Sequence, residues 1–309
     1  MTGTIHLGGG GDTSDEVGME NVVSPDPSAQ LVEVDDGTRL RTWTTGTRGA
    51  LPPVVLLHGG PGLWDYLEPV ARMVEHLTVV HRFDQRGCGG SDPSDEQTVA
   101  RHVADIDALR RHWGYEQWTV VGHSFGATLA FCYAVAHRES TAAMGYLSGV
   151  GVGDWHTPYA EERRRRMTEH QRQRLTQLEA RTDRTAPEEQ ELRALCWFTD
   201  YADPARGWEL ALAKARTEQV INVEANRVLN AETRRWSATE ILDQARSLTM
   251  PCWFVHGASD PRPTSTVARL AAAIPSASLH VVEDAGHEPW AERPDEVRRL
   301  LGLLVSASR

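Results

Sequence analysis

The sequence predicts an α/β fold with a mostly parallel, doubly wound sheet and an inserted helical cap. Short apolar runs of four to six residues recur along the chain, too continuous for strands with one face in water. Helical patterns separate most of these runs, so strand and helix alternate as in a doubly wound sheet. The alternation stops after about Gly153 and resumes near Met250. Because the intervening residues are nearly all helix-forming, we expect them to form the cap.

The sheet is expected to begin with two antiparallel strands. In LVEVDDGTRLRTWTTG, two alternating segments are joined by Asp36-Gly37, which is a strong hairpin signal. Six apolar runs follow and predict buried parallel strands: PVVLLHG, LTVVHRF, WTVVGHS, AAMGYLSG, MPCWFVHG and SLHVVED. The segments DEQTVARHVADIDALRRHW and GATLAFCYAVAH have helical patterns and lie between these strands.

These patterns divide the chain into three parts. Residues 1–29 are rich in Gly, Asp, Ser and Pro and lack apolar periodicity, which predicts a flexible tail. Residues 30–153 and 246–309 form the predicted core, and residues 154–245 form the predicted helical cap. The cap contains four consecutive arginines, 163–166, with glutamates at i,i+3 and i,i+4 helical spacing. We interpret this run as a solvated helix face.

Composition limits the possible partners. A formal net charge of -11 and a pI near 5.6 disfavour nucleic acid. No apolar run approaches the length of about 20 residues that spans a bilayer, and the N-terminus lacks a secretion-signal pattern. The four cysteines show no C-x-x-C spacing. We therefore expect a cytoplasmic protein with no membrane partner, no metal and no cofactor. The sequence leaves its oligomeric state open.

The predicted chemistry centres on Ser124. The segment Gly122-His123-Ser124-Phe125-Gly126 follows a predicted buried strand and leads into an Ala-rich helix. A serine at such a tight turn lies above the sheet edge, and glycines on either side let backbone segments approach closely. This pattern predicts a nucleophile. A serine nucleophile needs a base to take its proton and a carboxylate to hold that base.

Two later loops supply these groups. HGASDP offers Asp260 and EDAGHEPW offers His287, and each loop lies at the carboxyl end of a predicted strand. Parallel strands place these loops at the sheet edge that also carries Ser124. Asp154, after the preceding strand, is the alternative acid, whereas Asp284 is too close to His287 in the same loop to be preferred. We therefore predict a triad of serine, aspartate and histidine in that chain order.

The third strand leads into LLHGGPG, which we expect to help stabilise an oxyanion. Acyl transfer needs hydrogen-bond donors that are already aimed at the charge developing in the transition state. Residues without side chains let backbone N–H groups face a cavity, so Gly60 is predicted to supply one donor. Phe125, the residue after the serine, is predicted to supply the other.

Taken together, HGGPG, FDQRGCGGSDP, VVGHSFGA, HGASDP and AGHEPW resemble motifs of the α/β-hydrolase superfamily, over roughly residues 31–304. HGGPG and DQRG are most similar to its proline iminopeptidase branch. The resemblance implies a serine hydrolase with an acyl-enzyme, most closely an aminopeptidase or amidohydrolase that releases an N-terminal aminoacyl group. The implied partner is a small-molecule or short-peptide substrate. Related hydrolases often have a cis peptide in this turn, which predicts a cis Gly60–Pro61 bond.

The resemblance also implies substrate-binding residues. In that branch, acidic cap residues bind the free amino group of the substrate. NVEANRVLN is similar to a cap segment with one such residue, which maps to Glu224; Glu209 and Asp200 are lesser candidates. The other expected substrate contacts stand in or beside the motifs: Gly59, Trp64 and Trp290.

Two departures from that branch keep other functions open. The elbow has His-Ser-Phe where Gly-Ser-Trp is usual, and Leu63-Trp64-Asp65-Tyr66 replaces the expected Gly/Ser-rich residues. A carboxylesterase, lactonase or thioesterase of small-molecule metabolism is therefore the alternative. A non-catalytic small-molecule receptor on the same fold is a further one.

Overall fold

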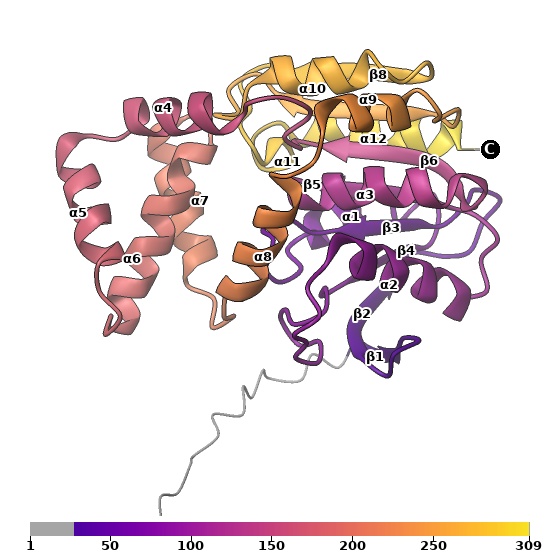
Figure 1. Cartoon of the computed structure of the whole chain (residues 1–309), viewed down its shortest axis with the longest axis horizontal. Coiled ribbons are helices and arrows are strands. Elements are labelled where there is room, and N and C mark those ends of the chain that lie inside the picture. The colour runs from indigo at the N-terminus through magenta and orange to yellow at the C-terminus, as the bar shows by residue number, and fades with distance from the viewer. Residues whose placement is uncertain (1–27, 309) are drawn as a thin grey trace, which may run out of the picture.

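The computed structural model describes residues 28–308, so the predicted tail lies almost entirely outside the described residues. An eight-stranded sheet has the order β1-β2-β4-β3-β5-β6-β7-β8 (Figure 1). The strands β1 (Gln30–Glu33) and β2 (Arg39–Thr45) form the predicted antiparallel hairpin, and β2 also pairs antiparallel with β4 (Val80–Phe83). All other pairs are parallel. The predicted α/β sheet is confirmed.

The six apolar runs all form strands. Besides β4, these are β3 (Val54–Leu57), β5 (Trp118–His123), β6 (Thr141–Leu147), β7 (Cys252–Gly257) and β8 (Ala277–Val282). Every residue of β3 and of β5 is buried, as expected for strands covered on both faces. β3 pairs with β4 on one side and with β5 on the other, which makes it the point where the strand order reverses. Open α/β sheets bind ligands at such a point.

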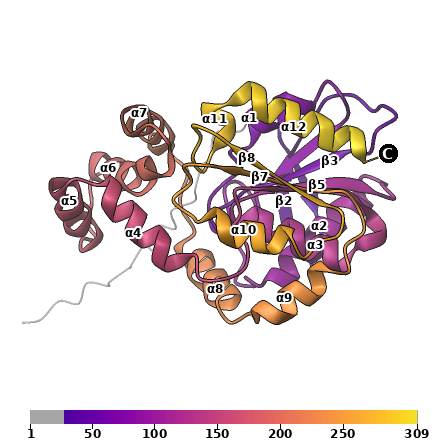
Figure 2. The same cartoon turned by 90° about the horizontal axis from the view of Figure 1, so that it is seen from above.

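Helices cover both faces of the sheet (Figure 2). One face carries α2 (Val99–His112), α3 (Phe125–Ala136) and α10 (Thr264–Ala271), and the other carries α1 (Glu68–Val74) and α12 (Pro294–Ala307). The short helices η1 (Arg138–Ser140) and α11 (Pro289–Glu292) complete the core. Because both faces are occupied, the carboxyl ends of the parallel strands provide the accessible edge.

The helices between β6 and β7 divide into two groups. Those of the first group are α4 (His156–Arg166), α5 (Glu169–Glu179), α6 (Ala186–Trp197), η2 (Phe198–Asp200) and α7 (Pro204–Ala215), which lie to the left in Figure 1. Buried residues of α5, α6 and α7 share a separate apolar cluster. The second group, α8 (Val223–Thr233) and α9 (Ala238–Ala245), contributes to the main core cluster instead. Only part of the predicted cap therefore packs as a separate lobe.

The described residues offer neither a membrane span nor a cluster of metal ligands. Within residues 28–308, no helix has both the length and the apolar character needed to cross a membrane. The same part of the chain holds no group of three His, Cys, Asp or Glu side chains placed to bind a metal ion. All four cysteines are free thiols.

Candidate active site

Ser124 lies in a strained turn between β5 and α3. Its φ of 56° and ψ of -118° are unusual for a residue with a side chain, and such strain is typical of functional sites. A Cβ on Gly122 would lie 1.9 Å from the oxygen of Gly126, and a Cβ on Gly126 would lie 2.0 Å from the oxygen of Leu57. The backbone N–H of Ser124 donates to Leu147 at 2.9 Å. This turn therefore requires glycine two residues before and two residues after Ser124.

The loops after β7 and β8 bring Asp260 and His287 together. The Nδ1 atom of His287 lies 2.7 Å from Oδ2 of Asp260, and both side chains are buried. The other carboxylate oxygen of Asp260 accepts the backbone N–H of Arg262 at 2.9 Å. The alternative acid, Asp154, is exposed and accepts N–H groups at the start of α4. Asp284 is exposed as well. His287 is thus joined to Asp260 rather than to either of the other two carboxylates.

The surroundings of Asp260 favour its charged form. Burial alone would raise the pKa of Asp260, but His287, His256 and Arg262 outweigh burial and hold that pKa well below its ordinary value. An ionised Asp260 accepts the Nδ1 proton of His287, so Nε2 of the same ring is available to accept a proton. Ser124 and His287 line the same cavity.

The loop after β3 contains Gly60, whose backbone N–H is unpaired within the described residues. Gly60 lines both of the cavities that meet at Ser124, and the predicted cis peptide joins it to Pro61. Within residues 28–308, neither the N–H of Gly60 nor that of Phe125 has a hydrogen-bond acceptor. A Cβ on Gly59 would lie 2.7 Å from the Cβ of Ser124, so glycine is needed for this loop to approach the serine.

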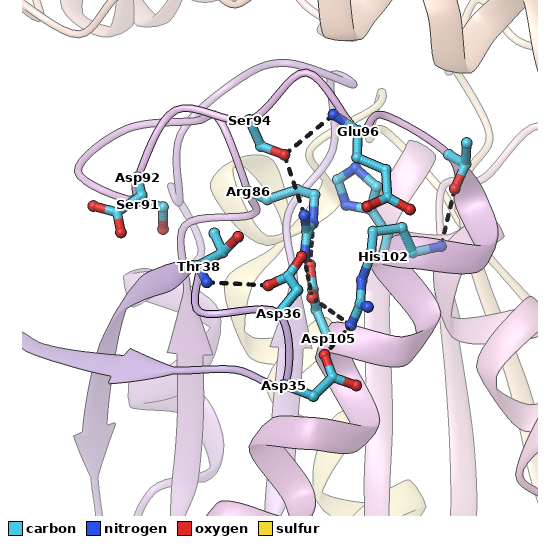
Figure 3. A network of polar contacts seen from close by, with 12 residues as sticks. Asp35, Asp36, Thr38, Arg86, Ser91, Asp92, Ser94, Glu96, His102 and Asp105 are labelled. Carbon is cyan, nitrogen blue, oxygen red and sulfur yellow. Dashed lines mark hydrogen bonds and ion pairs between the residues drawn. The ribbon is translucent and has the colours of Figure 1, made fainter.

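A polar network around the buried Arg86 anchors the segment that follows β4 (Figure 3). In the segment after β4, Arg86 donates two hydrogen bonds of 2.6 Å to Asp105 of α2 and one of 2.9 Å to Asp36. The adjacent Gln85 donates its backbone N–H to Nε2 of His58 at 3.0 Å and its side-chain amide to the oxygen of His58 at 2.7 Å. The DQRG motif therefore holds the start of the HGGPG loop in place.

His123, the residue before the serine, connects three loops. Its Nε2 lies 2.9 Å from the backbone oxygen of His287, which can only accept, so Nε2 carries the proton. Nδ1 then accepts the hydroxyl of Tyr66 at 2.6 Å, and the Tyr66 oxygen accepts the N–H of Gly59 at 2.9 Å. Burial first, and then the nearby His287, lower the pKa of His123 well below its ordinary value. The ring is therefore neutral, and this tautomer is fixed.

Two cavities meet at Ser124. Gly60, Ser124 and Arg262 line both of them. The larger has a volume of about 350 Å³, and no Asp or Glu of the described residues lines it. The smaller has a volume of about 190 Å³ and contains His287. Apolar and aromatic side chains dominate the larger cavity, among them Phe125, Phe131, Tyr146, Val152, Trp236 and Ile241. Charged side chains dominate the smaller one: Arg163, Asp200, Lys214, Arg262 and Glu288.

The prediction for Glu224 needs correction. Its side chain is 65% exposed in the first turn of α8, pairs with Arg227 at 2.5 Å, and lines neither cavity. The physical reason is the orientation of α8, whose Ala225 and Leu229 pack into the core. Glu209 is also exposed, whereas Asp200 lines the smaller cavity.

Three further predicted substrate contacts line neither cavity. Trp64 is buried and packs edge-on against Trp197, with ring centroids 6.3 Å apart. Trp290 is buried edge-on against His123, with centroids 4.6 Å apart. Gly59 donates its N–H to a tyrosine within the protein. These residues therefore support the site from behind, and the prediction that they contact substrate is corrected.

The arginine run is not uniformly solvated, so that interpretation is also corrected. Arg164 and Arg165 are exposed, but Arg163 lines the smaller cavity. Arg166 donates to the backbone oxygens of Thr199, Tyr201 and Ser259, the last at 2.7 Å. Residues three apart share one face of a helix. The spacing of the first and fourth arginines was therefore a signal that one pair could face the core.

Lys214 is a second residue that sequence reasoning missed. It is the only lysine in the chain, and it lies on α7 with its Nζ atom paired to Glu288. The same Nζ lies 4.3 Å from the ring centroid of Tyr66. Tyr201 also donates to Glu288, at 3.0 Å. A single lysine among many arginines was the available sequence signal.

Comparison with known proteins gives one family and several relatives. A family model described as the alpha/beta hydrolase fold matches residues 52–294. A proline iminopeptidase of Saccharolobus solfataricus is 25% identical over 275 residues, which is 84% of this chain and 86% of that protein.

Two solved structures have similar folds. A proline iminopeptidase of Mycobacterium smegmatis has a TM-score of 0.68 at 21% identity, over 91% of this chain and 98% of that one. A thermophilic esterase of Thermogutta terrifontis has a TM-score of 0.69 at 20% identity, also over 91% and 98%. At these identities the two structures bear on the fold alone.

Proposed function

Since the chain belongs to the α/β-hydrolase fold family, we propose that it is a serine hydrolase that works through an acyl-enzyme. The observation that supports this proposal most directly is the placement of Ser124. It occupies a strained elbow and shares a cavity with His287, whose Nδ1 atom lies 2.7 Å from Asp260. In this proposal Ser124 is the nucleophile, His287 is the general base and Asp260 orients the imidazole.

The reaction proceeds in two steps. Nε2 of His287 takes the proton of the Ser124 hydroxyl as its oxygen attacks the substrate carbonyl. The N–H groups of Gly60 and Phe125, which lack acceptors in residues 28–308, bind the resulting oxyanion. His287 then returns the proton to the leaving nitrogen or oxygen, the carbonyl bond to that atom breaks, and the acyl group stays on Ser124. Water, deprotonated by His287, hydrolyses this ester and regenerates the serine.

The two cavities support different roles for the two halves of the substrate. His287 lines only the smaller cavity, and the leaving group must lie beside the imidazole that protonates it. The acyl group then occupies the larger cavity, whose lining is mostly apolar and has no Asp or Glu of the described residues. Two arginines also line it: Arg262 is paired with Asp200, and Arg234 donates to His156. We therefore propose a carboxylic ester or amide with an uncharged, apolar acyl group as the substrate.

The sequence relatives favour a second candidate, an aminopeptidase. Such an enzyme needs a carboxylate for the α-ammonium group of its substrate, and Asp200 and Glu288 are the two in the smaller cavity. Asp200, however, pairs with Arg262 at 2.7 Å, and Glu288 pairs with Lys214. Both carboxylates are therefore already neutralised by the protein, so the charge distribution favours the uncharged acyl group.

A substrate comparison tests the proposal. The value of kcat/KM is measured for 4-nitrophenyl hexanoate, for the 4-nitroanilides of L-proline and L-alanine, and for N-acetyl-L-alanine 4-nitroanilide. We expect Ser124-dependent turnover of the hexanoate and no preference for the free amine over its N-acetyl counterpart. A strong preference for the free amine would favour the aminopeptidase. Turnover that survives Ser124→Ala would contradict both candidates.

A further inference from the structure

The smaller cavity contains more positive than negative charge. Its lining includes Arg163, Lys214 and Arg262 but only two carboxylates, Asp200 and Glu288. Both carboxylates are paired inside the protein, as described above. Arg262 donates through Nη1 to Asp200 at 2.7 Å and to Asp260 at 3.3 Å. Among the residues that the structure describes, Arg163 is the cation of this cavity without a carboxylate partner.

Arg163 has two buried donors with nothing to bind. Its Nε and Nη2 atoms have no hydrogen-bond acceptor within residues 28–308 and are covered by protein atoms in this side-chain conformation, so the side chain must turn toward the cavity for a ligand to reach them. Burying guanidinium donors without an acceptor is unfavourable for the free energy of folding. Two such donors beside a cavity therefore need an explanation. The Cys196 thiol, which also lines the cavity, interacts with the Arg163 side chain, but it does not supply a charge, because burial raises its pKa.

The identity of the two free donors specifies the acceptor. Nε–H and the adjacent Nη2–H point in parallel along one edge of a guanidinium, and this edge matches the two oxygens of a carboxylate. The ring of Tyr159 lies under this guanidinium, with 5.5 Å from Cζ of Arg163 to the ring centroid, and the same ring lies 4.5 Å from Cζ of Arg262. The aromatic contact supports the guanidinium without occupying its N–H groups.

We propose that the smaller cavity is a carboxylate subsite, in which Nε and Nη2 of Arg163 bind a carboxylate carried by the leaving group. The substrate is then an acyl amide of an amino acid or an acyl ester of a hydroxy acid. That the carboxylate belongs to the leaving group rests on the proposed function. Carboxylate binding at Arg163 rests only on the cavity and its unpaired donors.

Binding to catalytically inert protein tests the subsite without requiring turnover. In the Ser124→Ala background, calorimetry compares N-hexanoylglycine with N-hexanoylglycinamide, which replaces the carboxylate by a neutral amide. We expect the carboxylate ligand to bind at least tenfold more tightly. Adding Arg163→Gln should reduce this preference to about onefold, and Arg163→Lys should leave an intermediate preference because it keeps the charge and loses the paired edge.

Arg164→Gln is the matched control, since Arg164 is the next residue of α4 and is exposed. This variant should keep the full preference. Equal affinity for the two ligands in Ser124→Ala protein, or a preference that survives Arg163→Gln, would overturn the subsite. The Arg163→Lys protein keeps the comparison informative if Arg163→Gln fails to fold.

Turnover by the Ser124-containing protein separates the two substrate chemistries and the two proposals. Release of glycine from N-hexanoylglycine indicates an amide substrate, and hydrolysis of O-hexanoylglycolate without amide cleavage indicates an ester. Carboxylate binding without Ser124-dependent hydrolysis of either compound or of 4-nitrophenyl hexanoate would support the subsite and contradict the proposed function. Ser124-dependent hydrolysis without preferential binding of the carboxylate ligand would contradict the subsite and leave the proposed function standing.

Discussion

Nε2 of His123 lies 2.9 Å from the backbone oxygen of His287, so the residue before the serine holds the loop that carries the proposed base. Its other ring nitrogen accepts the Tyr66 hydroxyl, which in turn accepts the N–H of Gly59. One hydrogen-bonded chain therefore links the serine elbow, the histidine loop and the glycine loop. The elbow found here depends on histidine for this connection.

Tyr66→Phe tests whether this chain positions the catalytic groups. The substitution keeps the ring but leaves the N–H of Gly59 and Nδ1 of His123 without their partner, at a cost of about 1–3 kcal/mol per group. We expect kcat to fall about tenfold. Tyr115→Phe is the control, because its hydroxyl bonds to His81 at 3.0 Å and Tyr115 lines neither cavity. Equal kcat values for the two variants would contradict a positioning role.

Asp260→Asn tests the assignment of the acid. The asparagine cannot hold His287 in the required tautomer, so we expect kcat to fall about a thousandfold or more with little change in fold. Asp154→Asn should leave kcat nearly unchanged, because Asp154 is exposed and caps α4. Steady-state kinetics on 4-nitrophenyl hexanoate provide the measurement. If Asp154→Asn were the more damaging substitution, the acid would have to be reassigned.

Arg166→Gln tests the attachment of the separate lobe to the core. Arg166 donates to the backbone of Thr199 and Tyr201 in the lobe and to Ser259 beside the proposed acid. Removing these bonds should destabilise the protein by about 1–3 kcal/mol. Arg165→Gln is the matched control, since Arg165 is exposed and pairs only with Glu162 among the described residues, and it should leave stability nearly unchanged. Equal thermal denaturation midpoints for the two variants would refute this attachment.

Buried histidines predict a loss of stability on acidification. Burial lowers the pKa of His58 and of His81 to about 4 and that of His102 to about 3, from an ordinary value of 6.5. As the pH falls from 6.5 to about 4, the histidines of the unfolded chain bind protons that those of the folded chain do not, so the free energy of unfolding decreases. By about pH 5 each histidine should account for a loss of about 2 kcal/mol.

Asp84 opposes this trend without reversing it. Burial raises its pKa to about 6, so Asp84 stabilises the folded state as the pH falls through about 6 towards 4. Burial also raises the pKa of Asp65 and of Asp105, but it lowers the pKa of His123 and of His256 as well, so the buried histidines still outnumber these carboxyl groups. Urea denaturation at about pH 7 and about pH 5 measures the difference, and His102→Gln should make it smaller. A free energy of unfolding that stays constant or rises at about pH 5 would show that these histidines are not neutral in the folded protein.

The strands were predictable because their signal is local. Val54–Leu57 and Trp118–His123 are continuous apolar runs, and such runs are expected only where both faces of a strand are covered. The turn at Ser124 was predictable for a similar reason, since its flanking glycines are required by contacts within a few residues and with the adjacent strand. Asp260 and His287 could be brought to one edge by strand polarity alone.

The cavity linings were not predictable, because they depend on how helices are rotated against the core. Glu224 and Arg163 both lie on helices rich in charged residues, but only Arg163 faces a cavity. Sequence similarity suggested Glu224, and the only local signal for Arg163 was its spacing three residues before Arg166, which does not say which face of the helix meets a cavity. His123 illustrates the same limit, since its hydrogen bond to the loop of His287 spans 164 residues of sequence.

Labelling with a fluorophosphonate tests the central claim, that Ser124 is a nucleophile activated by His287, most directly. Peptide mass spectrometry of the labelled wild-type protein should find one phosphonylated residue, Ser124. Ser124→Ala should remain unlabelled, and His287→Ala should be labelled at least a hundredfold more slowly, because its serine lacks a base. Absence of label at Ser124, or an unchanged labelling rate in His287→Ala, would contradict the account.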